Sequence, residues 1–130
     1  MLGMVHDPRE FIRSMDLLVL TSLREVFPMV ILEAMASGTP VLSIDRGGIK
    51  EAVADGETGF LIPEHSADAF AEAVVAMHQS TPEDKENMSR AGRKKAEEEF
   101  SLEKMVRETM EEYLECGKEE TEWKRDRKPV

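Results

Sequence analysis

Apolar residues form three short continuous runs along the chain, at residues 17–20, 41–44 and 60–62. A continuous apolar run of this length is typical of a strand that is covered on both faces of a parallel sheet. Residues 2–5 are also apolar and have the length of the end of a further strand. Between and after these runs the apolar positions recur every three or four residues, which predicts helices. The alternation of strands and helices predicts a small parallel α/β layer of three or four strands, with extra helices at the C-terminal end.

The first helices are predicted from their end signals. Residues 7–14 read as a helix that Asp7 caps, with Pro8 at its first position and Phe11 and Ile12 facing inward. Residues 28–37 form the next helix, and Gly38 is expected to end it in the left-handed conformation. Its apolar residues cover so much of the surface that we expect most of this helix to be buried. They are Met29, Val30, Ile31, Leu32, Ala34 and Met35.

The remaining elements follow in order. Residues 49–54 predict a short helix and residues 55–59 a turn. Ser66 and Ser101 are candidate caps of the first and the last of three further helices, and Thr81-Pro82 starts the helix between them, up to about Phe100. The inward residues expected for the first of these three helices are Phe70, Ala73, Val74 and Met77. The last one carries an apolar stripe that consists of Leu102, Met105, Val106, Thr109, Met110 and Tyr113. Residues 117–130 are almost all charged, so we expect a domain over residues 1–116 and a disordered tail after it.

Composition excludes several classes of partner. The chain has 130 residues, is 34% charged and carries a formal net charge of −10. An acidic chain is a poor candidate for binding nucleic acid or an anionic membrane. Its backbone amides can still hold a small phosphorylated ligand. Cys116 is a single cysteine, so no disulfide framework is expected. With no 20-residue apolar run and no signal peptide pattern, the sequence predicts a cytoplasmic protein with no membrane span.

The loop and helix between the first two strands carry the candidate chemistry. Glu25 precedes this helix and Glu33 lies inside it, eight positions later. In a strand–loop–helix–strand unit the helix start lies at the carboxyl edge of the sheet, where phosphates bind. Carboxylates repel a phosphate but accept hydrogen bonds from hydroxyl groups, so the pair would suit the two polyols of a nucleoside diphosphate sugar. On spacing alone, two solvated surface glutamates remain the simpler interpretation.

Gly47 and Gly48 follow the second strand. Glycines at this place let a backbone approach a ligand closely, and a tight turn explains them equally well. The sequence contains no GxGxxG dinucleotide fingerprint, no Walker-type phosphate loop and no histidine spacing typical of a metal site. We therefore expect neither a metal nor another cofactor.

Residues 16–63, DLLVLTSLREVFPMVILEAMASGTPVLSIDRGGIKEAVADGETGFLIP, resemble the strongest signature of the retaining GT-B glycosyltransferases of group 1. This group includes sucrose, glycogen and phosphatidylinositol-mannosyl synthases. The resemblance extends from residue 2 to about residue 113. It implies a Rossmann-like three-layer sandwich, here part of the C-terminal domain that binds the nucleotide sugar. It also implies transfer of a sugar from a nucleoside diphosphate sugar to an acceptor.

The resemblance implies a role for each residue that matches the motif. Glu25 would contact hydroxyls of the transferred sugar as the catalytic glutamate, and Glu33 would hold the ribose. Backbone amides that would contact the sugar and the diphosphate belong to Phe27, Met29 and Val30. Residues that would shape the pocket wall are Ser22, Gly47 and Gly48. The base would lie near residues 3–6 and upstream of them.

Two departures from the family pattern change the expectation. Val26 stands where many members have glycine. In the family, an arginine and a lysine neutralise the diphosphate, and a separate domain binds the acceptor. These two residues and that domain have no counterpart in the sequence from Met1 onward. We therefore expect a chain that is inactive alone, either a piece of a longer enzyme or a half that needs an acceptor-domain partner chain. A non-catalytic nucleotide-sugar-binding module and a degenerate remnant that survives as an oligomer remain alternatives, and an exposed sheet edge would favour a homodimer.

Overall fold

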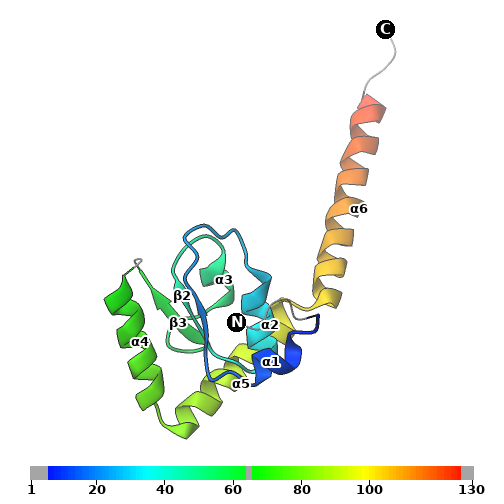
Figure 1. Ribbon diagram of the computed structural model, residues 1–130. Helices are drawn as coiled ribbons and strands as arrows, with labels where there is room; N and C mark the ends of the chain where they lie inside the picture. Colours follow the sequence, from blue (N-terminus) through cyan, green and yellow to red (C-terminus); the bar gives the residue numbers. More distant parts are fainter. Residues whose placement is uncertain (1–5, 64–65, 127–130) are drawn as a thin grey trace. The chain divides into compact units, whose positions relative to one another are not determined.

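The computed structural model describes residues 6–63 and 66–126. It divides into two compact units, residues 1–97 and 98–130, which are described separately. The first unit contains three parallel strands, β1 (Leu18–Leu20), β2 (Val41–Ile44) and β3 (Gly59–Ile62), in the order β1-β2-β3 (Figure 1). The predicted parallel α/β fold is confirmed. The strand predicted at residues 2–5 lies outside the described residues.

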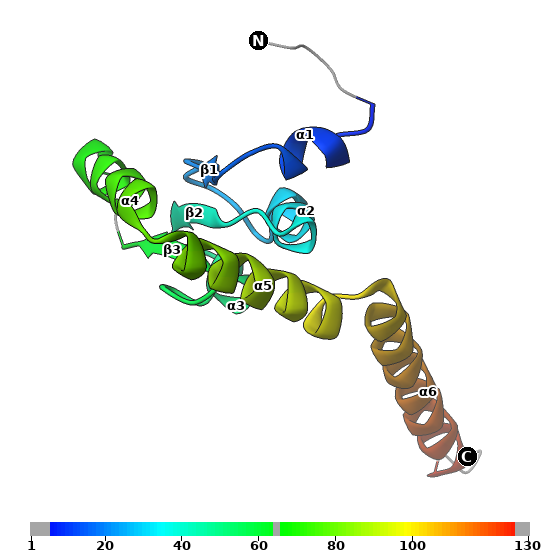
Figure 2. The same ribbon diagram turned by 90° about the horizontal axis from the view of Figure 1, so that it is seen from below.

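The central strand β2 organises the core, because all four of its residues are buried. Successive side chains of a strand point to opposite faces of the sheet. Leu42 and Ile44 form a cluster with Ile62, and helix α4 (Ala67–Gln79) packs against it through residues that include Phe70 and Ala73. Helix α2 (Met29–Ser37) contacts β2 as well. In both views the strands lie between α4 and α2, so the sheet is the middle layer (Figures 1 and 2).

Strand β1 is less buried than the sequence predicted. Val19 is 42% exposed, although a continuous apolar run indicates a strand covered on both faces. The reason is its place in the sheet: within the described residues β1 pairs only with β2 and therefore forms an edge. This edge is the exposed sheet edge that the sequence led us to expect.

Helix α1 (Arg9–Arg13) buries one of its two predicted inward residues. Ile12 is buried, whereas Phe11 is 44% exposed, because a five-residue helix turns only one narrow stripe toward its neighbour. The helix starts one residue later than predicted, with Pro8 as its N-cap, and the Asp7 carboxylate accepts from the Arg9 amide at 3.1 Å. The buried Thr39 hydroxyl donates to the Ile12 carbonyl at 2.8 Å and ties α1 to the end of α2.

Helix α2 ends as predicted but is less buried than predicted. Gly38 adopts φ 79°, the left-handed conformation expected of a helix-ending glycine. Ile31, Ala34 and Met35 are buried, whereas Met29 is 62% exposed. Met29 lies in the first turn, at the carboxyl edge of the sheet, where no described element covers it.

Small residues allow close packing elsewhere in the first unit. A Cβ on Gly59 would lie 2.4 Å from the Val41 carbonyl oxygen, so glycine lets β3 pair with β2 at this register. Gly92 and Ala96 are the buried residues of α5 (Pro82–Glu99), and Gly92 lies over Met35. Helix α3 (Ile49–Ala52) is shorter than the predicted helix over residues 49–54.

The cap predicted at Ser66 and the helix start predicted at Thr81-Pro82 are confirmed. The Ser66 hydroxyl accepts from the Ala69 amide at 3.3 Å at the start of α4, and the Thr81 hydroxyl accepts from the Asp84 amide at 3.1 Å at the start of α5. The predicted inward side of α4 is only partly buried, since Met77 is buried but Val74 is 43% exposed.

The second unit consists mainly of α6 (Leu102–Asp126). The Ser101 hydroxyl caps it by accepting from the Lys104 amide at 3.3 Å. The helix continues through Gly117 to Asp126, contrary to the predicted disordered tail. One glycine costs a helix about 1 kcal/mol relative to alanine, and the Glu, Lys and Arg residues around it favour a helix. The predicted stripe is present in α6, and its members Leu102, Met105, Val106, Met110 and Tyr113 are exposed.

Candidate functional site

The candidate site lies at the carboxyl edge of the sheet and is built from two loops. Residues 21–28 connect β1 to α2, and residues 45–48 connect β2 to α3. Because β1 and β2 are parallel neighbours, both loops leave the sheet at the same edge. The fold therefore brings Ser22 and Glu25 to the edge that also carries Gly47 and Gly48.

The two loops touch through their backbones. The Gly48 amide donates to the Val26 carbonyl at 2.8 Å. A Cβ on Gly47 would lie 2.3 Å from the Glu25 carbonyl oxygen, and a Cβ on Gly48 would lie 2.8 Å from both the Val26 carbonyl oxygen and Phe27 Cδ2. We call this set of contacts between Gly47-Gly48 and residues 25–27 the loop contact. It adds a third explanation for the two glycines, besides a tight turn and a close approach to ligand.

The start of α2 lacks a side-chain cap. Pro28 is the N-cap, no side chain accepts from the first turn, and this turn contains no acidic residue. Helix starts carry unpaired amides and about half a positive charge, which a side-chain oxygen often satisfies. Here the amides of Met29 and Val30 lie in that first turn, while the Ile31 amide donates to the Pro28 carbonyl at 3.1 Å. This helix start is suited to an anionic ligand.

The two glutamates lie in different surroundings. Glu25 is half-buried in the β1–α2 loop, and Glu33 is exposed on the second turn of α2. Within the described part of the chain, neither carboxylate forms a hydrogen bond or an ion pair with another residue. Both therefore remain free to accept from a ligand.

Glu33 lines a groove of about 850 Å³. Its wall includes residues of α1, Ala36 and Ser37 of α2, and Arg93 of α5. Glu25 is not among the residues that line this groove. The sequence did not predict the groove, although the alternation of charges over residues 7–13 marks one of its walls.

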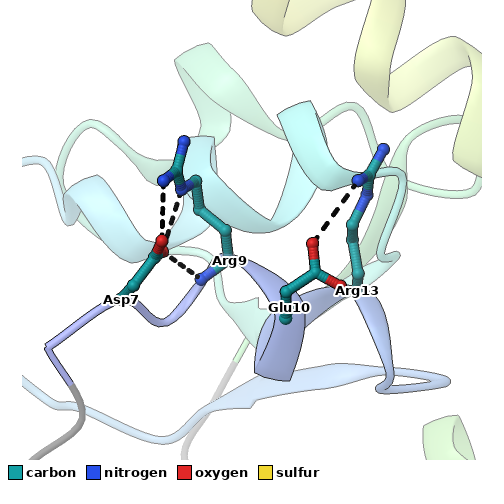
Figure 3. Close-up of polar contacts among 4 residues, drawn as sticks. All are labelled: Asp7, Arg9, Glu10 and Arg13. Atoms are coloured by element: carbon teal, nitrogen blue, oxygen red, sulfur yellow. Dashed lines mark hydrogen bonds and ion pairs between the residues drawn. The ribbon is translucent and has the colours of Figure 1, made fainter.

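The charged side chains of that wall pair with one another (Figure 3). Arg9 donates through Nε and Nη2 to Asp7 at 2.8 and 2.6 Å, and Arg13 lies 3.8 Å from Glu10. The hydrogen bonds from the Arg9 side chain and amide lower the pKa of Asp7 from its ordinary value to about 2. Asp7 is therefore ionised and paired with Arg9 at neutral pH.

The other predicted site residues are placed nearby. Ser22 and Val30 are half-buried, Phe27 is half-buried beside Gly48, and Met29 is exposed. The buried Ser43 hydroxyl donates to the Leu20 carbonyl at 3.3 Å and holds the carboxyl ends of β1 and β2 together.

The described residues contain neither a membrane-spanning helix nor a metal-binding cluster. No helix among them is both long and apolar enough to cross a membrane. No group of three or more His, Cys, Asp or Glu residues in residues 6–63 and 66–126 is arranged to hold a metal ion.

Residues 1–95 match the family described as glycosyl transferases group 1. This chain belongs to that family. The matched segment contains β1, β2 and β3, both loops of the candidate site and the two glutamates. The family resemblance of residues 16–63 is thereby confirmed.

The curated relatives are several times longer than this chain. D-inositol 3-phosphate glycosyltransferase of Paenarthrobacter aurescens is 36% identical over 104 residues, which is 80% of this chain and 25% of that protein. The enzyme of the same name from Nocardia farcinica is 46% identical over 65 residues, 50% of this chain and 14% of that protein. The chain thus spans about a quarter of the relatives' length or less.

Solved structures show the same fold. A glycosyltransferase from Rickettsia africae has a TM-score of 0.81 at 25% identity, over 85% of this chain and 30% of that one. Sucrose-phosphate synthase from Thermosynechococcus elongatus has a TM-score of 0.76 at 29% identity, over 82% and 26%. Alr3699/HepE of Anabaena, solved in complex with UDP-glucose, has a TM-score of 0.73 at 26% identity, over 82% and 29%. The chain therefore has the fold of part of a GT-B glycosyltransferase.

Proposed function

We propose that this chain forms the donor side of a glycosyltransferase, which binds a nucleoside diphosphate sugar and contributes to transfer of its sugar with retention. The observation that carries the proposal is the loop contact beside the uncapped start of α2. It places the Glu25 loop, two glycines and free helix amides at one edge of the sheet. HepE, a structural neighbour, was solved with UDP-glucose, which makes UDP-glucose the first ligand to test.

The diphosphate would lie at the start of α2. The first turn offers the amides of Met29 and Val30 to phosphate oxygens, and the helix dipole favours negative charge there. In our proposal the Phe27 amide contributes from the preceding loop. Pro28 has no amide N–H to donate, and in our proposal its ring holds the backbone between Phe27 and Met29.

The transferred sugar would lie next to Glu25. An ionised carboxylate repels the diphosphate but accepts from hydroxyl groups, so it orients the sugar rather than the phosphates. Glu25 is half-buried and has no competing partner among the described residues. We assign it to the sugar hydroxyls and therefore treat it as the catalytic residue. Ser22 and the two glycines form the nearby pocket wall in this proposal.

The nucleoside would lie in the groove beside α2. Glu33 is exposed and lines this groove, and in our proposal its carboxylate accepts from the two ribose hydroxyls. His6, at the edge of the described chain, also lines the groove, which agrees with the expectation that the base lies near residues 3–6. Residues 3–5 lie outside the described residues.

We propose that sugar transfer requires an acceptor-binding domain in addition to this chain. The chain covers 25% of the first curated relative, so the isolated polypeptide would bind donor without turnover. Its surroundings would be the cytoplasm. A second candidate is a non-catalytic nucleotide-sugar-binding module that assembles into oligomers. The exposed apolar stripe of α6 favours that candidate, because such a face is typical of an interaction surface.

Isothermal titration calorimetry tests the proposal. We expect UDP-glucose and UDP to bind the folded chain at one site, and Glu33→Gln to weaken both about tenfold or more, since a hydrogen bond to a charged group contributes about 1.5–3 kcal/mol. The matched control is Glu72→Gln, on the exposed side of α4, which should leave both affinities unchanged. Absence of binding at millimolar ligand would refute the proposed donor site, and transfer by the isolated polypeptide would refute the requirement for another domain.

A further inference from the structure

We infer that Gly47 and Gly48 are positioning residues, which hold the Glu25 loop in place through the loop contact and thereby set where the Glu25 carboxylate lies. The inference gives these glycines a role that does not require them to touch the ligand. It rests on the proposed function, because the assignment of Glu25 to the sugar comes from there.

The backbone on the C-terminal side of Glu25 is held at several points. The carbonyl oxygen of Glu25 lies against Gly47, and the next carbonyl, that of Val26, accepts from the Gly48 amide at 2.8 Å. The peptide groups on the C-terminal side of Glu25 are therefore held by the β2–α3 loop. On its far side this segment enters Pro28, whose ring fixes φ at −76°. Little backbone freedom remains between Glu25 and the start of α2.

The glycines of this chain with positive φ differ in what surrounds them. Gly38 and Gly56 also have positive φ, 79° and 74°, yet a Cβ on either would meet nothing within 4 Å. These two glycines are explained by backbone conformation alone. Gly47 combines a φ of 57° with a Cβ position 2.3 Å from a backbone oxygen, so here both conformation and contact require glycine.

Gly48 isolates the contact from the conformation. Its φ of −80° is accessible to any residue, so alanine would cause no strain in the isolated backbone. The clash would come only from the Val26 carbonyl and the Phe27 ring, each 2.8 Å from the new Cβ. An alanine at this position must displace residues 25–27 or move its own loop.

The consequence is a specific effect on sugar recognition. Displacement of the Glu25 loop should weaken the binding of UDP-glucose more than that of UDP. In our proposal UDP loses only the Phe27 amide, and Glu33 and the Met29 and Val30 amides of α2 still hold it. We therefore expect the preference for UDP-glucose over UDP to depend on residues 47 and 48. If the two glycines contributed only to overall stability, their substitution would lower the affinities for UDP and UDP-glucose equally or leave both unchanged.

The experiment compares Gly48→Ala with Gly56→Ala and Glu25→Gln, each shown to be folded by its thermal unfolding transition. Calorimetry gives the ratio of the Kd of UDP to the Kd of UDP-glucose. We expect Gly48→Ala to lower this ratio about tenfold, toward the value in Glu25→Gln, with a smaller change in the Kd of UDP than in the Kd of UDP-glucose. Gly56→Ala should keep the wild-type ratio. An unchanged ratio in folded Gly48→Ala would overturn the inference.

Amide NMR spectra of the ligand-free protein test the loop contact itself. Gly48→Ala should shift the amides of Glu25, Val26 and Phe27, and Gly56→Ala should not. If those amides stay in place, the loop contact does not position Glu25 and the inference fails. If neither UDP nor UDP-glucose bound the wild-type chain, the proposed function would be refuted instead. The spectra of the ligand-free protein would still decide whether the two loops are coupled.

If Gly48→Ala does not fold, hydrogen exchange in the wild-type chain replaces it. A sugar held by Glu25 should tighten the segment to which Gly48 donates, so UDP-glucose should slow exchange of the Gly48 amide more than saturating UDP does. Equal slowing by the two ligands would contradict the inference.

Discussion

The surroundings of Glu25 and Glu33 differ in what holds them in place. Glu25 belongs to a loop whose backbone is fixed by another loop, through a 2.8 Å hydrogen bond and two glycines. Glu33 belongs to a regular helix turn and faces a groove whose opposite wall consists of ion-paired side chains. Backbone contacts fix geometry more firmly than exposed ion pairs, which typically contribute under about 1 kcal/mol. The comparison indicates a rigid sugar end and an adaptable nucleoside end of the proposed donor site.

The largest expected effect is a loss of unfolding free energy in Gly47→Ala. Alanine at φ 57° carries backbone strain of about 1–3 kcal/mol, and its Cβ would also lie 2.3 Å from the Glu25 carbonyl oxygen. Urea denaturation should show a loss of unfolding free energy of about 3 kcal/mol or more. Gly56→Ala is the matched control with the strain but without the contact, and it should lose clearly less. Equal losses would mean that the loop contact adds no stability.

The next largest expected effect is a difference in ligand affinity between the variants Glu25→Gln and Glu33→Gln. Glu25→Gln should weaken UDP-glucose about tenfold and leave UDP unchanged, whereas Glu33→Gln should weaken both ligands about equally, since a charge-assisted hydrogen bond contributes about 1.5–3 kcal/mol. Calorimetric titration of each variant with both ligands measures this. The assignment of the sugar end and the nucleoside end would be reversed if Glu25→Gln weakened UDP as strongly as UDP-glucose.

A smaller effect is expected from the buried contact behind the groove. Thr39→Val removes the 2.8 Å hydrogen bond to the Ile12 carbonyl, which still accepts from the Met15 amide at 3.0 Å, so the expected loss of unfolding free energy is about 0.5–1.5 kcal/mol. Chemical denaturation should detect this loss, and UDP should bind more weakly because α1 loosens against α2. Thr39→Ser keeps the hydroxyl and serves as the control. A Thr39→Val variant with wild-type stability would show that this bond does not hold α1.

The smallest expected effect is the change in stability at low pH when Asp7, in the groove wall, loses its pairing with Arg9. The pKa of Asp7 is lowered to about 2 by its hydrogen bonds with Arg9, so the pair contributes stability above the ordinary Asp value and loses it as the pH falls through about 2. A carboxyl NMR titration should show this low pKa, and Arg9→Gln should raise it toward the ordinary value. The pair is solvent-exposed, so the accompanying change in unfolding free energy should be small. An unchanged Asp7 pKa in Arg9→Gln would contradict the assigned cause.

Local signals in the sequence predicted most of the fold. The buried strand β2, the left-handed Gly38, the caps Ser66 and Ser101 and the helix start at Thr81-Pro82 each depend on a few neighbouring residues, and the structure confirms them. The exposed Val19 and Met29 were mispredicted because their burial depends on which elements lie beside them. The length of α6 was mispredicted because the dense charge after Gly117 was taken to indicate disorder, although Glu, Lys and Arg favour a helix.

The candidate site was predictable in its residues but not in its contacts. The eight-residue spacing of Glu25 and Glu33 and the position of Gly47-Gly48 after a strand are visible in the sequence. That the two glycines lie against residues 25–27 depends on the approach of two loops that are about twenty residues apart, marked by the 2.8 Å hydrogen bond from the Gly48 amide to the Val26 carbonyl, and no local pattern encodes it. The groove beside Glu33 likewise requires α1, α2 and Arg93 of α5 to be placed in space.

The central claim is that the chain binds a nucleotide sugar at the carboxyl edge of its sheet, and amide NMR mapping of the wild-type chain tests it most directly. Titration with UDP-glucose should shift the amides of Met29 and Val30 at the start of α2, together with those of Glu25 and Gly48, in a saturable manner. Amides of α4, which packs on the sheet far from these loops in sequence, should stay in place. Shifts confined to α4 or α6, or none at millimolar UDP-glucose, would contradict the account.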